Sequence, residues 1–120
     1  MSEQFRWVDI KSLDELERFY NLALIKIREA AKNCGYAIGV HGSLRRDLDL
    51  IAVPWVENHK DRDVLAAEIH KAACGLKMAK YQWEEKPNGR VATMFPICWI
   101  DFEAFGEVKD GMGHIDLSVK

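Results

Sequence analysis

The chain has 120 residues, which suits one domain spanning 1–120, and its 48% hydrophobic residues are enough for a core. Its 17 basic and 19 acidic residues give a net charge of −2, which excludes a broad basic field for a nucleic-acid backbone. No run is apolar enough to cross a bilayer, and the first residues lack a signal-peptide pattern. We therefore expect a soluble protein with neither membrane nor nucleic acid as a partner.

The first predicted element is a helix over 12–34, where apolar residues recur at helical spacing. Ser12 and Glu15 match a capping box at its start, and Gly35 is a typical residue for ending a helix.

Two strands are expected next, over 36–41 and 47–53, joined by a tight connection. The second begins with acids that alternate with leucines and then becomes wholly apolar, so it enters the core from a polar end. Pro54 cannot donate to a strand ladder and closes it.

The rest of the chain predicts a helix over 62–74, a strand over 77–83, a turn at 86–89, a strand over 90–101, a loop over 106–113 and a last strand over 114–119. Asp61 is the expected N-cap of the second helix, and Gly75 its end. The order α-β-β-α-β-β-β predicts an α+β fold, in which helices pack on one face of a small mixed sheet.

The segment with the clearest chemistry is the connection between the first two strands. Asp47 and Asp49 lie two residues apart on a strand, so their carboxylates point the same way. Oxygen ligands of this kind suit Mg²⁺, and two such ions can clamp the oxygens of a phosphoryl displacement. Phosphate oxygens could be bound by the turn and cations before the acids, at Gly42, Ser43, Arg45 and Arg46.

Gly-Ser followed by Asp-x-Asp on the next strand resembles the signature of the polymerase-β-type nucleotidyltransferase superfamily. The form HGSLRRDLDLIAVPW also resembles small phage and bacterial proteins that carry this family label. The resemblance implies that Gly42 and Ser43 hold a nucleoside triphosphate, and that Asp47 and Asp49 bind metal ions. It also implies a third carboxylate on a later strand.

Asp116 best matches the third carboxylate, since it alternates with Ile115 and Leu117 on the last predicted strand, and Asp101 is its rival. The sequence departs from the family in two ways. Only Leu44, Arg45 and Arg46 separate Gly-Ser from the acids, where the family has a longer insert, and the helical domain that often holds the acceptor is missing.

The resemblance implies a Mg²⁺-dependent enzyme that transfers a nucleotidyl group from a nucleoside triphosphate to a hydroxyl acceptor. The alternatives are a catalytically inactive binding module of a phage or mobile element, and a structural subunit of a hetero-oligomer. The missing acceptor domain and the four tryptophans predict a protein partner or a homo-oligomer.

Each candidate residue also has a plainer interpretation. Gly42 and Ser43 could form an ordinary turn, and the acids could be solvated at a strand end, paired with Arg45 or Arg46. His41 could contact a phosphate or act as a base, but a hydrogen-bonded strand-end histidine is the plainer interpretation. His114 should face the same side as Asp116 and could be a site residue, with an exposed histidine as the plainer interpretation. Zinc is disfavoured because no CxxC or HxxxH pair is present, and the nucleotide loops GxxxxGK[ST] and GxGxxG are absent. Three cysteines without close spacing argue against a disulfide framework and for a reducing cytoplasm.

Overall fold

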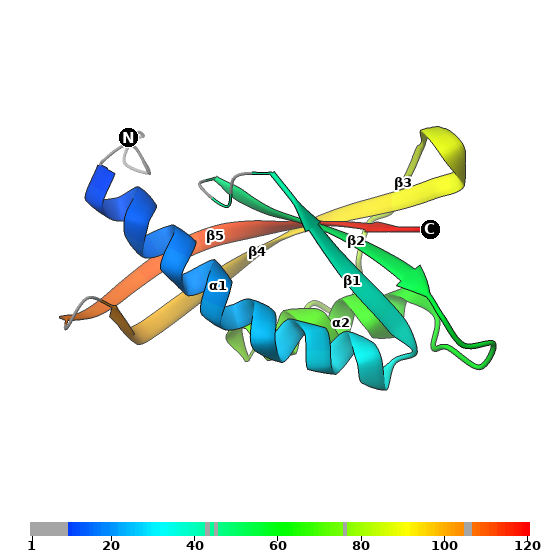
Figure 1. Ribbon diagram of the computed structural model, residues 1–120, viewed down its shortest axis with the longest axis horizontal. Coiled ribbons are helices and arrows are strands. Elements are labelled where there is room, and N and C mark those ends of the chain that lie inside the picture. Colours follow the sequence, from blue (N-terminus) through cyan, green and yellow to red (C-terminus); the bar gives the residue numbers. More distant parts are fainter. Residues whose placement is uncertain (1–9, 43, 45, 76, 105–106) are drawn as a thin grey trace.

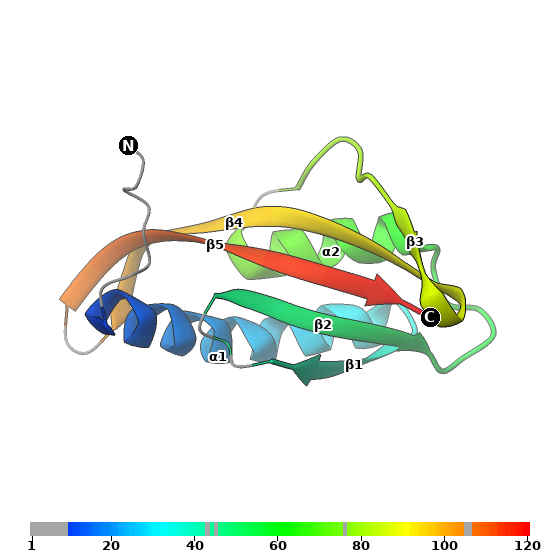
Figure 2. The same cartoon turned by 90° about the horizontal axis from the view of Figure 1, so that it is seen from above.

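The computed structural model describes residues 10–42, 44, 46–75, 77–104 and 107–120, with side chains within those ranges from 16 to 98 and from 112 to 120. The described chain forms helices α1 (Ile10–Asn33) and α2 (Arg62–Cys74) and strands β1 (Tyr36–His41), β2 (Asp47–Pro54), β3 (Glu84–Lys86), β4 (Arg90–Ala104) and β5 (Glu107–Val119). Figure 1 and Figure 2 show both helices on one face of the sheet. The predicted α+β class and element order are confirmed. None of the described helices is long and apolar enough to cross a membrane.

The strands form one mixed sheet in the order β1-β2-β5-β4-β3. β2 and β5 pair in parallel, whereas the other three pairings are antiparallel. The chain leaves β2, passes through α2, β3 and β4, and returns as β5 beside β2. Two segments that are more than 50 residues apart in sequence therefore share the centre of the sheet.

The core lies between the sheet and the two helices. In β2 the buried residues Leu48, Leu50 and Ala52 alternate with more exposed ones, as expected of a strand covered on one face. Helix α1 supplies Leu16, Tyr20 and Ile27, none of which is exposed. The alternation fixes which side chains of each strand face the helices and which face away.

The predicted caps of α2 are confirmed. Asp61 accepts hydrogen bonds from the backbone N–H groups of Asp63 and Val64, and Gly75 ends the helix at a φ of 78°. The capping box predicted for α1 is wrong, because the helix begins at Ile10 and Ser12 lies inside its first turn. Gly35 ends α1 as predicted, at a φ of 89°.

Two predicted boundaries in the second half are wrong. Residues 77–83 form no strand, and β3 covers only Glu84–Lys86. Tyr81 turns inward in this segment and is 6% exposed, so side-chain packing rather than a ladder holds the chain there.

The predicted loop at 106–113 is also wrong, because β5 already begins at Glu107 and pairs with β4. Gly113 is needed in the strand itself. A Cβ there would lie 2.5 Å from the hydroxyl oxygen of Tyr20, so glycine lets β5 approach α1 closely.

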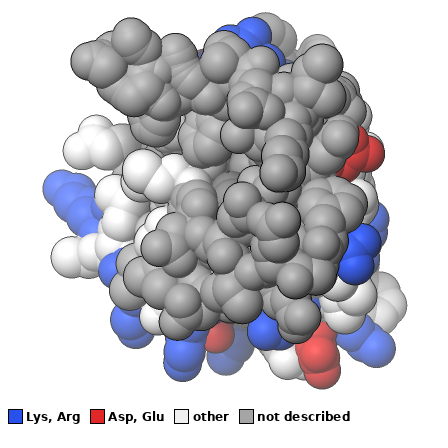
Figure 3. All heavy atoms as spheres, turned by 90° about the vertical axis from the view of Figure 1, so that its left-hand side faces the viewer, with Lys and Arg blue, Asp and Glu red and all other residues white. Residues whose placement is uncertain are grey.

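Charges are mixed over the described surface. Figure 3 views the end at which α1 begins, and lysine and arginine side chains lie mainly along its lower edge, the helix side, with acids between them.

A buried histidine fastens the segment before β3 to the core. His70 of α2 is 4% exposed, and its ring centroid lies 4.5 Å from that of Phe95. Its Nε2 lies 2.9 Å from the carbonyl oxygen of Pro96, and its Nδ1 lies 3.1 Å from the Tyr81 hydroxyl. A carbonyl only accepts, so Nε2 carries the proton and the Tyr81 hydroxyl donates to Nδ1. Burial lowers the pKa of His70, because it disfavours the charged ring.

We predict that His70 makes the fold sensitive to mild acid. With a pKa lowered in the folded state, the neutral ring contributes stability that is present above the unfolded pKa of about 6.5 and is lost as the pH falls below it. Urea unfolding at several pH values should therefore show a smaller loss of stability on acidification for His70→Gln, which cannot titrate, than for the unmodified chain. Equal losses would contradict the prediction.

Candidate functional site

The register of the sheet places three candidate side chains in one row. His41 of β1 pairs with Asp49 of β2, and Asp49 pairs with Asp116 of β5. Adjacent strands lie about 4.8 Å apart, so the two carboxylates are direct neighbours. Asp47 lies one pair further along, opposite His114. The structure thus brings together His41, Asp47, Asp49 and Asp116, although His41 and Asp116 lie 75 positions apart in the sequence. We call the three acids of this group the acidic row.

All three acids point away from the helices. Asp47, Asp49 and Asp116 are partly exposed, and the residues that alternate with them are buried against α1 and α2: Leu48, Leu50, Ile115 and Leu117. The prediction that Asp47 and Asp49 share a face is confirmed. His114 is on this face too and is half-buried.

The acids crowd one another electrostatically. Burial is the main cause of a raised pKa at Asp49, and the neighbouring carboxylate of Asp116 raises it further, with a smaller contribution from Asp47. His41 acts in the opposite direction and lowers the pKa of Asp49. Like charges on adjacent strands disfavour ionisation, so this cluster would gain from a bound cation.

Gly42 lies against the carboxylate of Asp49. Its φ of 91° is in the left-handed region that favours glycine, and a Cβ on it would come within 2.9 Å of Asp49 Oδ2. The glycine is therefore required twice, by the turn and by the close approach of the acid. The turn interpretation is therefore confirmed for Gly42, and phosphate binding by this residue stays a prediction.

A tyrosine on the apolar side of α1 supports the backbone of the site through its hydroxyl. The Tyr20 hydroxyl donates to the backbone carbonyl of Arg46 at 2.8 Å and accepts from the backbone N–H of His114 at 3.1 Å. Arg46 precedes Asp47, and His114 lies opposite Asp47, so one hydroxyl ties the connection before β2 to β5.

The pKa of the Tyr20 hydroxyl is also affected by the neighbouring acids. Burial raises the pKa of Tyr20 to about 12, and the charges of Asp47 and Asp49 add to the rise, against the His114 hydrogen bond. A tyrosine at a helical apolar position gave no signal of this role, since only the fold places it under the acids.

The remaining predicted site residues are not placed in the acidic row by the strand pairing. Ser43 and Arg45 lie outside the described residues, and Arg46 is exposed beside Asp47. Asp101 lies in β4 at an irregularity between Trp99 and Phe102. The β4 partner of Asp116 is Met94, so the ladder places Asp101 roughly 20 Å further along the strand. Asp116, and not Asp101, is the residue that the sheet brings beside Asp49.

Within the described residues, no group of three or more His, Cys, Asp or Glu side chains is already arranged to hold a metal ion. Asp49 and Asp116 are direct partners on β2 and β5, whereas Asp47 lies two residues before Asp49 and pairs with His114.

No protein-family model, curated protein or solved structure matches the chain. The geometry of the acidic row and its supports is therefore the basis for a functional proposal.

We predict that Asp49→Asn stabilises the protein at pH 7. A carboxyl whose pKa is raised in the folded state favours folding when protonated and costs stability once the pH rises through that pKa. The amide removes this cost, so thermal denaturation should give a higher Tm for the variant at pH 7. The gap should narrow toward about pH 4, where more of Asp49 is protonated. A lower Tm at pH 7 would show that the charge makes net favourable contacts.

We predict that Tyr20→Phe costs about 1–2 kcal/mol, because a backbone carbonyl and an N–H group lose their partner. Hydrogen exchange at the His114 amide should also become faster. Tyr36→Phe is the matched control, since the Tyr36 hydroxyl donates to the Lys60 carbonyl away from the site. That control should lower stability to a similar extent without changing exchange at His114, and equal changes in both variants would refute the anchoring role.

Proposed function

We propose that the chain is a Mg²⁺-dependent nucleotidyltransferase, which transfers a nucleotidyl group from a nucleoside triphosphate to a hydroxyl acceptor. The observation that carries the proposal is the in-register pair of Asp49 and Asp116 on parallel strands, with Asp47 on the same face. This placement supports the resemblance of Gly-Ser and Asp-x-Asp to the nucleotidyltransferase superfamily, which rests on the sequence alone.

The residues present fit Mg²⁺. Carboxylate oxygens are its preferred protein ligands. Burial is the main cause of the raised pKa of Asp49, and the Asp116 and Asp47 carboxylates add negative charge that a cation would neutralise. Asp47, Asp49 and Asp116 would hold the ion, while the missing Cβ of Gly42 leaves Asp49 Oδ2 accessible from the turn side. The ion would supply charge stabilisation for the phosphoryl oxygens.

The other residues bind and orient the triphosphate. Backbone groups at Gly42 and Ser43 would face its phosphates, and Arg45 and Arg46 would offset their charge. In the transfer, the acceptor oxygen bonds to the α-phosphorus and the bond from that phosphorus to the bridging oxygen breaks. Its electron pair leaves with pyrophosphate, and the hydroxyl proton passes to the Asp116 carboxylate.

A second candidate, a catalytically inactive binding module that acts through another protein, is favoured by one surface. On α1, Leu22 is 44% and Ile25 is 68% exposed, beside a cavity lined chiefly by apolar residues of α1 and α2. Large apolar side chains in such an arrangement are typical of protein interfaces. A homo-oligomer or protein partner is compatible with both candidates, as is a reducing cytoplasm, because Cys34, Cys74 and Cys98 are all free thiols.

We predict Mg²⁺-dependent nucleotide binding that needs Asp116. Isothermal titration with each of the four common nucleoside triphosphates should show binding in Mg²⁺ that EDTA abolishes. Asp116→Asn should weaken it at least about tenfold, since one anionic ligand is lost, and should leave the protein folded. Glu57→Gln, an exposed acid away from the row, is the control and should bind normally. Binding that is unchanged by both EDTA and Asp116→Asn would refute the proposed metal site.

A further inference from the structure

Two large apolar side chains of α1 lie on the side of the helix that faces solvent. Leu22 is 44% exposed and Ile25 is 68% exposed. Each lies two residues before a buried side chain, Leu24 and Ile27 respectively, and two residues correspond to about 200° around an α-helix. The packing of the core therefore explains the buried residues of α1, but it does not explain why Leu22 and Ile25 are apolar.

A cavity of about 380 Å³ lies beside these two side chains, between α1 and α2. Figure 1 shows the two helices side by side against the sheet. The wall of the cavity includes Phe19 and Ala23 of α1 and Ala72 and Ala73 of α2. Three of these four residues are alanines, so the hollow results from small side chains, and an isoleucine side chain from outside can fill part of it.

Charged residues flank the two apolar side chains along α1. Arg18 lies four residues before Leu22, Glu29 lies four residues after Ile25, and both are exposed. Residues three and four positions apart are neighbours on a helix surface, so positions 18, 22, 25 and 29 form one continuous stripe. We call these four residues the outer stripe. It is basic at one end, apolar in the middle and acidic at the other end.

The outer stripe is complementary to a second copy of itself in the antiparallel orientation. With a two-fold axis midway between residues 22 and 25, Arg18 of each chain lies opposite Glu29 of the other. The same axis places Leu22 of each chain opposite Ile25 of the other. A parallel pairing would instead bring two arginines together at one end and two glutamates together at the other, which is unfavourable. The charge pattern therefore favours a symmetric dimer, the commonest form of protein oligomer.

We propose that two copies of this chain associate through the outer stripe, with their α1 helices antiparallel. Ile25 of each copy packs against Leu22 and the adjoining cavity of the other copy, while Arg18 and Glu29 form ion pairs at both ends of the contact. From residue 18 to residue 29 the contact extends over about 17 Å of helix. An interface of this length belongs to the small, weakly associating class.

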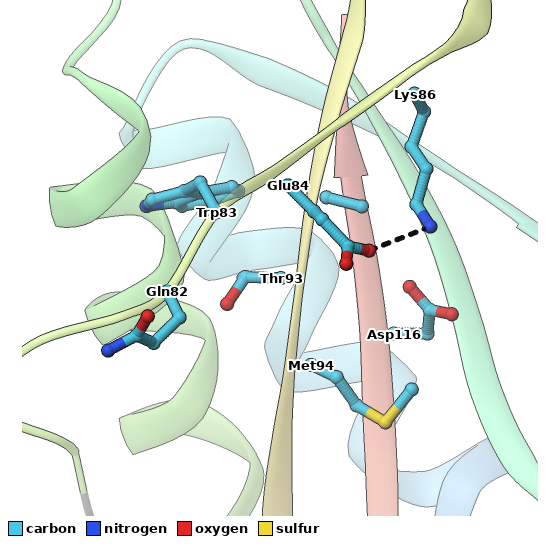
Figure 4. Close-up of a pocket in the computed structure, with 8 residues that line it drawn as sticks. Gln82, Trp83, Glu84, Lys86, Thr93, Met94 and Asp116 are labelled. Atoms are coloured by element: carbon cyan, nitrogen blue, oxygen red, sulfur yellow. Dashed lines mark hydrogen bonds and ion pairs between the residues drawn. The ribbon is translucent and has the colours of Figure 1, made fainter.

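The proposed dimer leaves the acidic row accessible. Asp47, Asp49 and Asp116 point away from the helices, whereas the outer stripe lies on the helix side of the molecule. Figure 4 shows Asp116 on β5, beside Glu84 and Lys86 of β3. Each chain of the dimer would therefore keep its own site. The proposal is independent of the nucleotidyltransferase function, because self-association through α1 requires neither nucleotide nor Mg²⁺.

The test is sedimentation velocity of the full chain from roughly 1 µM to 1 mM, the range in which weak dimers dissociate. The unmodified chain should change from monomer to dimer, and Ile25→Glu, which places a charge at the apolar centre, should raise the dimer Kd at least about tenfold. Val64→Glu is the matched control, because Val64 is a 40% exposed apolar residue of α2 outside the cavity. A chain that stays monomeric at the highest concentration, or equal Kd values for Ile25→Glu and Val64→Glu, overturns the proposal.

Charge reversal tests the antiparallel orientation. Arg18→Glu and Glu29→Arg each place like charges opposite one another at both ends, so each should raise the Kd at least about threefold. The double variant restores opposite charges and should recover the original Kd. A parallel dimer would gain nothing from the double variant, so a folded double variant without recovery overturns the proposed arrangement. Thermal denaturation checks that each variant is folded, and Ile25→Glu and Glu29→Arg test the interface without changing Arg18.

Discussion

The in-register parallel pairing of β2 with β5 is the interaction on which the rest of the structure depends. It closes the centre of the sheet and sets Leu48 beside Ile115 under the helices, and Asp49 beside Asp116 on the other face. A slip of one residue would turn Asp116 into the helix-packed layer and expose its apolar neighbours. The apolar packing of α1 and α2 therefore also holds the acids in place.

The pairing of β2 with β5 brings the carboxylates of the acidic row close together, and their mutual repulsion is offset in part by His41. Burial and the neighbouring carboxylates raise the pKa of Asp49, and His41 across the ladder counters them. The Tyr20 hydroxyl fixes the backbone on both sides of the row, through Arg46 and His114. Perturbed pKa values of this kind cluster at functional sites in proteins.

Asp116 belongs both to the row of acids and to the wall of a cavity of about 340 Å³ beside β3. One side of the pocket is the central sheet, and the other is a short strand whose approach is fastened to α2 through Trp83 and Tyr81. The small size of β3 is thus no sign of a loose edge. The hydrogen bonds of Trp83 and Tyr81 to α2, together with the short ladder between β3 and β4, determine where this wall lies.

Short sequence patterns predicted the structure correctly where a residue type has one characteristic structural role, such as capping a helix. Asp61 and Gly75 limit α2 because a cap needs an acceptor at one end and a left-handed residue at the other. The acid–leucine alternation of β2 likewise fixed a common face for Asp47 and Asp49. The same local reasoning failed at Gly113, because a glycine in a turn and a glycine at a close strand–helix contact look alike in sequence.

The sequence by itself determined the fold class, the order of the elements and the shared face of the acid pair, since these follow from periodicity and caps within short windows. Only the tertiary structure decided that Asp116 stands beside Asp49 and that Tyr20 supports the site. The physical reason is that strand neighbours in a mixed sheet are chosen by long-range packing. No single segment of the sequence therefore predicts which residues become partners across β2, β5 and β4.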